Sequence, residues 1–92
     1  MTREQVLAWL DTRRPVPPDS LRARLRTAVE QQRPAVGSAL PAYLAQLGRT
    51  LLDGVAARAD GGRELALDLL AADAFATYAF EAQAEDGRGS SE

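Results

Sequence analysis

Residues 40–55 read LPAYLAQLGRTLLDGV and carry the most regular apolar pattern in the chain. Its large aliphatic residues recur at intervals of three or four: Leu40, Leu44, Leu47, Leu51 and Val55. This spacing places them on one side of a helix, so it predicts a helix over residues 38–59 with one buried face. Gly48 and Gly54 flank that face, where they would let a neighbouring helix approach closely.

The segment over residues 63–84 also has helical spacing, but its apolar residues form two sides instead of one stripe. One side is formed by Leu65, Leu69, Ala72, Ala76 and Phe80. The other is formed by Leu67, Phe75 and Tyr78, with Leu70 between the two sides. A helix that is apolar around most of its circumference is normally central or buried at an interface. We therefore take Leu67, Leu70, Phe75 and Tyr78 as candidate partner-interface residues.

Two shorter helices are expected before this pair, over residues 2–13 and 20–32, separated by the proline-rich residues 14–18. Trp9 lies on the first of them, either as an anchor to the longer helices or as a fifth candidate contact for a partner. The turn Asp60-Gly61-Gly62 would join the two long helices into an antiparallel hairpin. The sequence thus predicts one all-α domain over residues 1–84, an irregular four-helix bundle built on this C-terminal hairpin, with a disordered tail over residues 85–92.

The composition excludes several kinds of chemistry. The chain has no Lys, Ile, Asn, His or Cys, so all of its basic residues are Arg. Scarcity of Lys, Ile and Asn is typical of a GC-rich bacterial genome. Without Cys and His there can be no disulfide, no common zinc site, no Ser-His-Asp triad and no cysteine nucleophile. We therefore expect a non-enzymatic protein with no metal, cofactor or small-molecule ligand.

Targeting signals are not evident in the sequence. The N-terminal residues are polar and lead directly into an amphipathic pattern, unlike a signal peptide. Asp68 and Asp73 interrupt the most apolar stretch, so no segment approaches the ~20 residues of a membrane span. A cytoplasmic location is expected.

The basic residues of the N-terminal half suggest an alternative function. They could contact an anion or nucleic-acid phosphates: Arg13, Arg14, Arg22, Arg24, Arg26 and Arg33. The whole chain is acidic, with a formal net charge of −2 and a pI near 5.1, which does not favour a nucleic-acid-binding protein.

The residues Leu70-Ala71-Ala72-Asp73-Ala74-Phe75-Ala76-Thr77-Tyr78-Ala79-Phe80 support a remote third hypothesis. They resemble one helix of the trans-isoprenyl diphosphate synthases, which often reads Leu-Ala-Gly-Asp-Ala-x-x-Thr-x-Ala-Phe. The resemblance covers residues 70–80 only. Those enzymes bind Mg²⁺–diphosphate through two Asp-rich motifs, and this chain has no adjacent Asp pair, so no catalytic residue is carried over.

The apolar excess of residues 63–84 is the feature that points most directly to a function. We expect a non-catalytic helical module for protein–protein interaction or oligomerisation, which associates with itself or serves as an accessory subunit of a larger complex. A small nucleic-acid-binding regulator is the alternative, and an isoprenoid-synthase-related helical protein is the remote one.

Overall fold

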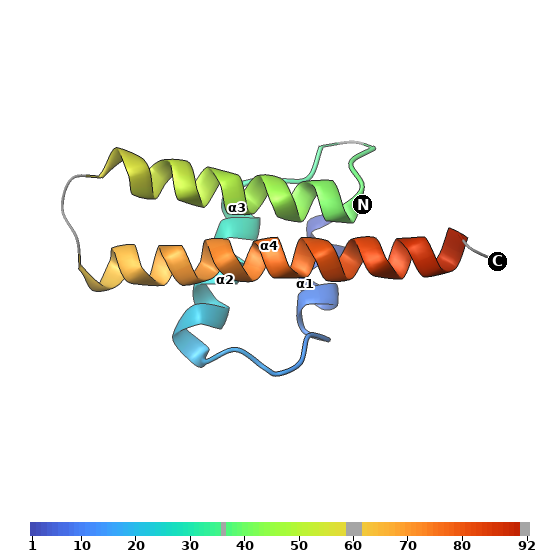
Figure 1. Ribbon diagram of the computed structural model, residues 1–92, viewed down its shortest axis with the longest axis horizontal. Coiled ribbons are helices and arrows are strands. Elements are labelled where there is room, and N and C mark those ends of the chain that lie inside the picture. The colour runs from blue at the N-terminus through green and yellow to red at the C-terminus, as the bar shows by residue number, and fades with distance from the viewer. Residues whose placement is uncertain (36, 59–61, 91–92) are drawn as a thin grey trace.

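The computed structural model describes residues 1–35, 37–58 and 62–90, with the backbone alone for residues 87–90. In these ranges the chain forms helices α1 (Arg3–Leu10), α2 (Asp19–Gln31), α3 (Leu40–Ala57) and α4 (Arg63–Ser90), and no strand (Figure 1). The predicted all-α class is confirmed. Among the described residues, no helix combines the length and the apolar content that crossing a bilayer requires.

The first helix begins with the capping box that its sequence predicts. The Thr2 hydroxyl accepts a hydrogen bond from the Gln5 amide, and the Gln5 side chain accepts one from the Thr2 amide. The helix ends at Leu10 rather than at residue 13, because the amides of Thr12 and Arg13 bond to carbonyls three residues back and close a tight turn. The proline-rich segment follows, and α2 begins at Asp19 without a side-chain cap.

The fourth helix extends beyond its predicted end at residue 84 and reaches Ser90, so residues 85–90 belong to the helix instead of a tail. Residues 63–86 contain no glycine or proline, so nothing in the sequence of this segment stops the helix at residue 84. The indole of Trp9 donates a hydrogen bond to Glu85 and so fixes this part of α4 against α1. Helix α3 ends at Ala57 and Arg58 is already extended, so the helix stops before its predicted end at residue 59. Most of the predicted turn at residues 60–62, and residues 91–92, lie outside the described residues.

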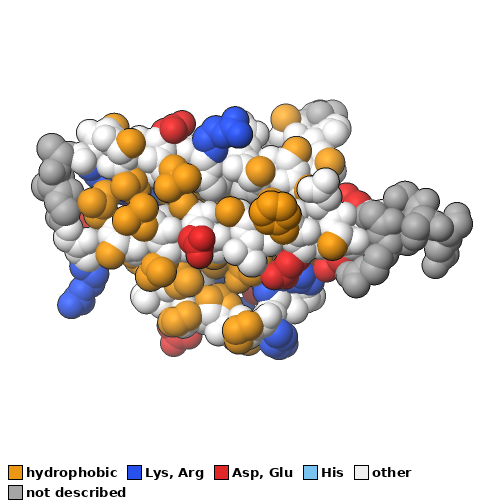
Figure 2. All heavy atoms as spheres, viewed as in Figure 1, with side chains coloured by type: hydrophobic (Ala, Val, Ile, Leu, Met, Phe, Trp, Pro, Cys, Tyr) orange, Lys and Arg blue, Asp and Glu red, His pale blue; other side chains and the backbone are white. Residues whose placement is uncertain are grey.

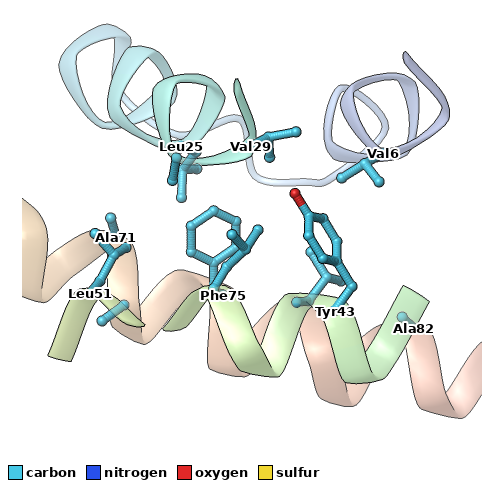
Figure 3. Packing of buried hydrophobic residues seen from close by; sticks show 12 residues of the cluster. Val6, Leu25, Val29, Tyr43, Leu51, Ala71, Phe75 and Ala82 are labelled. Atoms are coloured by element: carbon cyan, nitrogen blue, oxygen red, sulfur yellow. The ribbon is translucent and has the colours of Figure 1, made fainter. Parts of the chain in front are cut away.

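The helices form two layers. Helices α3 and α4 lie side by side and antiparallel, as the sequence predicts, and make one layer (Figure 1). Helices α1 and α2 make the second layer and cross one face of the hairpin steeply (Figures 1 and 3). We call the face covered by α1 and α2 the inner face of the hairpin and the opposite one the outer face.

The core lies between the two layers. Its largest fully buried side chains come from all four helices: Val6, Val29, Leu44, Leu47 and Phe75. Figure 3 shows side chains of α1 and α2 pointing toward those of the hairpin. The hydroxyl of Tyr43, on α3, donates a hydrogen bond to the Gln32 carbonyl at the end of α2 and so ties the layers together. Burial, opposed by the charge of Arg3, raises the pKa of Tyr43 above its ordinary value, so the phenol remains a donor at neutral pH.

Close approach of the two long helices depends on Gly48. A Cβ added at this residue would lie 3.2 Å from the carbonyl oxygen of Ala72 and 3.5 Å from the Cβ of Phe75. The expected role of Gly48 in helix packing is therefore correct. It does not extend to Gly54, where an added Cβ would meet nothing within 4 Å.

This difference makes the two glycines a matched pair for a stability test. Gly54→Ala should stabilise the protein by up to about 1 kcal/mol, because alanine is the better helix former and its methyl group has room. Gly48→Ala should gain the same helix propensity, but its methyl group would push α4 away from α3. The Gly48→Ala variant should therefore be less stable than the Gly54→Ala variant by about 1–3 kcal/mol. Chemical denaturation followed by circular dichroism measures both values. Equal stabilities for the two variants would contradict the close approach at Gly48.

Candidate protein interaction surface

The five apolar residues predicted to form an interface do not share one surface. Phe75 is 0% exposed and lies in the core, whereas Leu70 is 56% exposed. Leu67 is half-buried, as are Trp9 and Tyr78, which pack against each other. Four of the five predicted residues are therefore wholly or partly covered by the rest of the chain, and Leu70 is the exception.

Trp9 and Tyr78 join α1 to α4. Their rings meet edge to face, with centroids 6.1 Å apart and an interplanar angle of 82°. The guanidinium of Arg13 lies 3.8 Å from the centroid of the Trp9 ring and donates hydrogen bonds to Glu81 at 2.9 Å and to Glu85 at 3.1 Å. Burial and the Glu81 carboxylate, opposed by Arg13, raise the pKa of Tyr78. Trp9 thus has the anchoring role rather than that of an exposed partner contact.

The outer face of the hairpin carries an apolar groove of about 650 Å³ between α3 and α4. Its lining is formed by small and apolar residues with two polar ones: Ala39, Pro41, Ala42, Ala45, Gly48, Arg49, Leu52, Ala72, Ala76, Ala79, Phe80 and Gln83. Figure 2 shows hydrophobic side chains gathered over both helices of this face. Phe80 is 77% exposed and Leu52 is 50% exposed, so a large aromatic and an aliphatic side chain stand in solvent here.

Helical spacing explains why these residues share a face. On α3, Pro41, Ala45, Gly48 and Leu52 recur every three or four residues and lie beside the buried leucine stripe. On α4, Leu69, Ala72, Ala76 and Phe80 do the same, and Leu69 is 45% exposed. The sequence showed this side of α4 as one of its two apolar sides. It did not show that the side of Phe75 and Tyr78 would be covered and the side of Phe80 left bare.

The six arginines proposed as anion contacts are mostly paired with carboxylates of the same chain. Arg13 pairs with Glu81 and Glu85, Arg24 pairs with Asp68 at 2.6 Å, and Arg22 and Arg26 lie 3.1 and 3.8 Å from Asp11. Arg14 donates to the backbone carbonyls of Asp11 and Arg13. Arg33 is exposed and makes no ion pair among the described residues.

Four of these arginines line a small pocket of about 190 Å³ beside the proline-rich segment: Arg13, Arg14, Arg22 and Arg26. Asp11 lines the same pocket and accepts from Arg22, so part of the positive charge is already neutralised. This arrangement holds α1, α2 and α4 together more directly than it offers free cations to a phosphate backbone.

Asp68 is the one buried charged residue among those described, and it links three helical segments. Its carboxylate accepts hydrogen bonds from Arg24 of α2 and from Arg58, which follows α3. Burial would raise the pKa of Asp68, but the hydrogen bonds and positive charges of Arg24 and Arg58 outweigh it and lower the pKa below its usual value. Asp68 therefore stabilises the fold as a charged group.

This pKa shift predicts a pH dependence of stability. Because the folded-state pKa of Asp68 is lowered, its contribution is present above the unfolded-state pKa of about 4 and is lost as the pH falls through the folded-state value. Asp68→Asn should cost about 2–3 kcal/mol at pH 7, since it leaves Arg24 partly buried without its partner. It should also flatten the loss of stability in acid.

Denaturation curves at several pH values between 2 and 7 measure both effects. Asp53→Asn is the control, because Asp53 is exposed and makes no ion pair among the described residues. If Asp68→Asn and Asp53→Asn had the same stability at pH 7, the linking role of Asp68 would be wrong.

No cluster of three or more acidic side chains that could hold a metal ion occurs among the described residues. In comparisons with protein-family models, curated proteins and solved structures, no significant match to this chain is found. The interpretation of its function therefore depends on the geometry of the chain itself.

Proposed function

We propose that this chain is a non-catalytic module for protein–protein interaction or oligomerisation, and that it binds its partner through the outer face of the α3–α4 hairpin. It would act in the cytoplasm, by self-association or as an accessory subunit of a larger complex. The observation that carries this proposal is the exposure of Phe80 beside the apolar groove.

The energetic argument starts from the large side chains on the outer face. Burying an exposed leucine or phenylalanine side chain contributes about 1.5–3 kcal/mol. Phe80, Leu52 and Leu69 are each close to half exposed or more. Phe80 and Leu52 line one continuous groove, and helical spacing places Leu69 on the same side of α4 as Ala76 and Phe80, so these side chains are not scattered. Contiguous apolar surface of this kind is typical of interaction sites, whereas isolated exposed apolar residues are common on any protein.

The shape of the groove favours a helical partner. Its floor consists largely of Ala45, Gly48, Ala72 and Ala76, whose short side chains allow another backbone to come close. Leu52 and Phe80 stand beside this floor as large side chains. Packing of a helix requires this combination of holes for incoming side chains and projections that fill its own grooves.

The composition supports the non-catalytic part of the proposal. The chain lacks His, Cys and Lys, which are the residues used most often as bases, nucleophiles and Schiff-base amines. The carboxylates that the fold brings together, Asp68, Glu81 and Glu85, are bonded to arginines or to Trp9 of the same chain.

Photo-crosslinking tests the proposed surface directly. Phe80→p-benzoylphenylalanine places a photoreactive group on the outer face, and Glu30→p-benzoylphenylalanine places the same group on the exposed side of α2. In cells that express the chain, irradiation should give a discrete protein adduct from position 80 and little or none from position 30. Adding Ala76→Arg should abolish the adduct, because the larger side chain fills the groove floor. Equal yields at the two positions would mean that the outer face is not the binding surface.

A further inference from the structure

We propose that the partner on the outer face is a second copy of this chain, related to the first by a two-fold axis parallel to the hairpin. The two hairpins would then form a four-helix core, in which α3 of each copy packs on α4 of the other. All neighbouring helices in this core are antiparallel, the usual up-down arrangement of four-helix bundles. This inference depends on the function proposed above and specifies the partner.

The heights of two charged residues along the hairpin support this symmetry. A Cβ added at Gly48 would meet Ala72, Phe75 and Ala76, so Gly48 lies level with the middle of residues 72–76 on α4. Because the two helices run in opposite directions, the next residue on α3 lies level with residue 73 on α4. These residues are Arg49 and Asp73, of opposite charge. Arg49 lines the outer groove, and Asp73 lies one helical turn from both Leu69 and Ala76 of that face.

Neither charge has a partner among the residues that the structure describes. Both Arg49 and Asp73 are exposed, and among the described residues neither of them makes an ion pair or a side-chain hydrogen bond. A two-fold rotation about an axis parallel to the hairpin leaves the position of each residue along that axis unchanged. It places α3 of the second copy opposite α4 of the first, and α4 of the second copy opposite α3 of the first. It therefore places Arg49 of each copy opposite Asp73 of the other and forms two equivalent ion pairs at the rim.

The same rotation also brings apolar side chains of the two copies together. Phe80 of α4 lies at the end of the groove that the first turns of α3 border with Pro41, Ala42 and Ala45. In the dimer, Phe80 of each copy would rest on these small residues of the other copy. At the opposite end, Leu52 of α3 and Leu69 of α4 both lie beyond the close approach at Gly48, on the side away from Phe80. The rotation brings Leu52 of one copy onto Leu69 of the other.

The size of the face is sufficient for a stable dimer. The molecule measures 49 × 27 Å when viewed onto this face (Figure 2). A stable interface buries about 800 Å² per partner, which is less than the area of this outline. The second copy would not meet α1 and α2, because they cover the inner face.

Sedimentation equilibrium of the purified chain across nanomolar to micromolar concentrations tests this proposal. The wild type should form a dimer. Arg49→Asp and Asp73→Arg should each weaken the dimer by about tenfold or more, because each replaces two attractive pairs with two repulsive ones. The double variant Arg49→Asp/Asp73→Arg should restore the dimer, since it rebuilds both pairs with the charges exchanged. Glu30→Arg, an exposed charge reversal on α2, which the second copy would not meet, is the control and should leave the dimer intact.

Each alternative result has a defined meaning. A wild type that remains monomeric at all concentrations would overturn the proposal of a second copy. If position 80 then still crosslinked to a different protein in cells, the proposed interaction function would stand without this inference. A dimer that the single variants do not weaken, or that the double variant does not restore, would overturn the proposed symmetry. Circular dichroism of every variant distinguishes loss of the dimer from loss of the fold.

Discussion

The close approach of α3 and α4 at Gly48 is the constraint on which the rest of the structure depends. It sets the height of one helix against the other, because an added Cβ at that residue would press on the Ala72 carbonyl oxygen. It also leaves a shallow floor of small residues between the helices. One face of the resulting hairpin is covered by α1 and α2, and the other face keeps its apolar groove open (Figures 1 and 2).

The apolar excess of α4 follows from its place in this arrangement. The helix packs on α3 along one side and on α2 along another, and through Tyr78 and Glu85 it holds Trp9 of α1. Its third side, which includes Leu69, Ala76 and Phe80, is exposed, and no other described element covers it. A chain of 92 residues without cysteine has few other sources of stability, and oligomerisation is one way in which small domains bury enough apolar surface.

The sequence predicted the helical class and the hairpin because both depend on local spacing. The leucine stripe of α3 is an example: Leu44, Leu47 and Leu51 are all buried. The interface could not be located in the same way, because periodicity gives the angle of a residue around its helix but not the neighbour it faces. Phe75 and Phe80 both belong to apolar sides of α4, yet one is in the core and the other in solvent.

The arginines show the same limit of sequence reasoning. Arg13 and Arg24 looked like members of one basic set because they are near each other in the chain. Their carboxylate partners, Glu81 and Asp68, are far away in sequence and become neighbours only when α4 packs against the first two helices. Arginines before and within α2 thus pair with carboxylates of α4 inside the fold.

Thiol reactivity on the outer face tests the central claim, that this face is covered when the protein assembles. The chain has no cysteine, so Ala76→Cys introduces a single thiol on the groove floor, and Ala23→Cys introduces one on the exposed side of α2. As the protein concentration rises, the thiol at position 76 should react more slowly with a maleimide reagent, while the thiol at position 23 reacts at a constant rate. If both thiols react equally fast at every concentration, the outer face is not covered by a second copy and the account is contradicted.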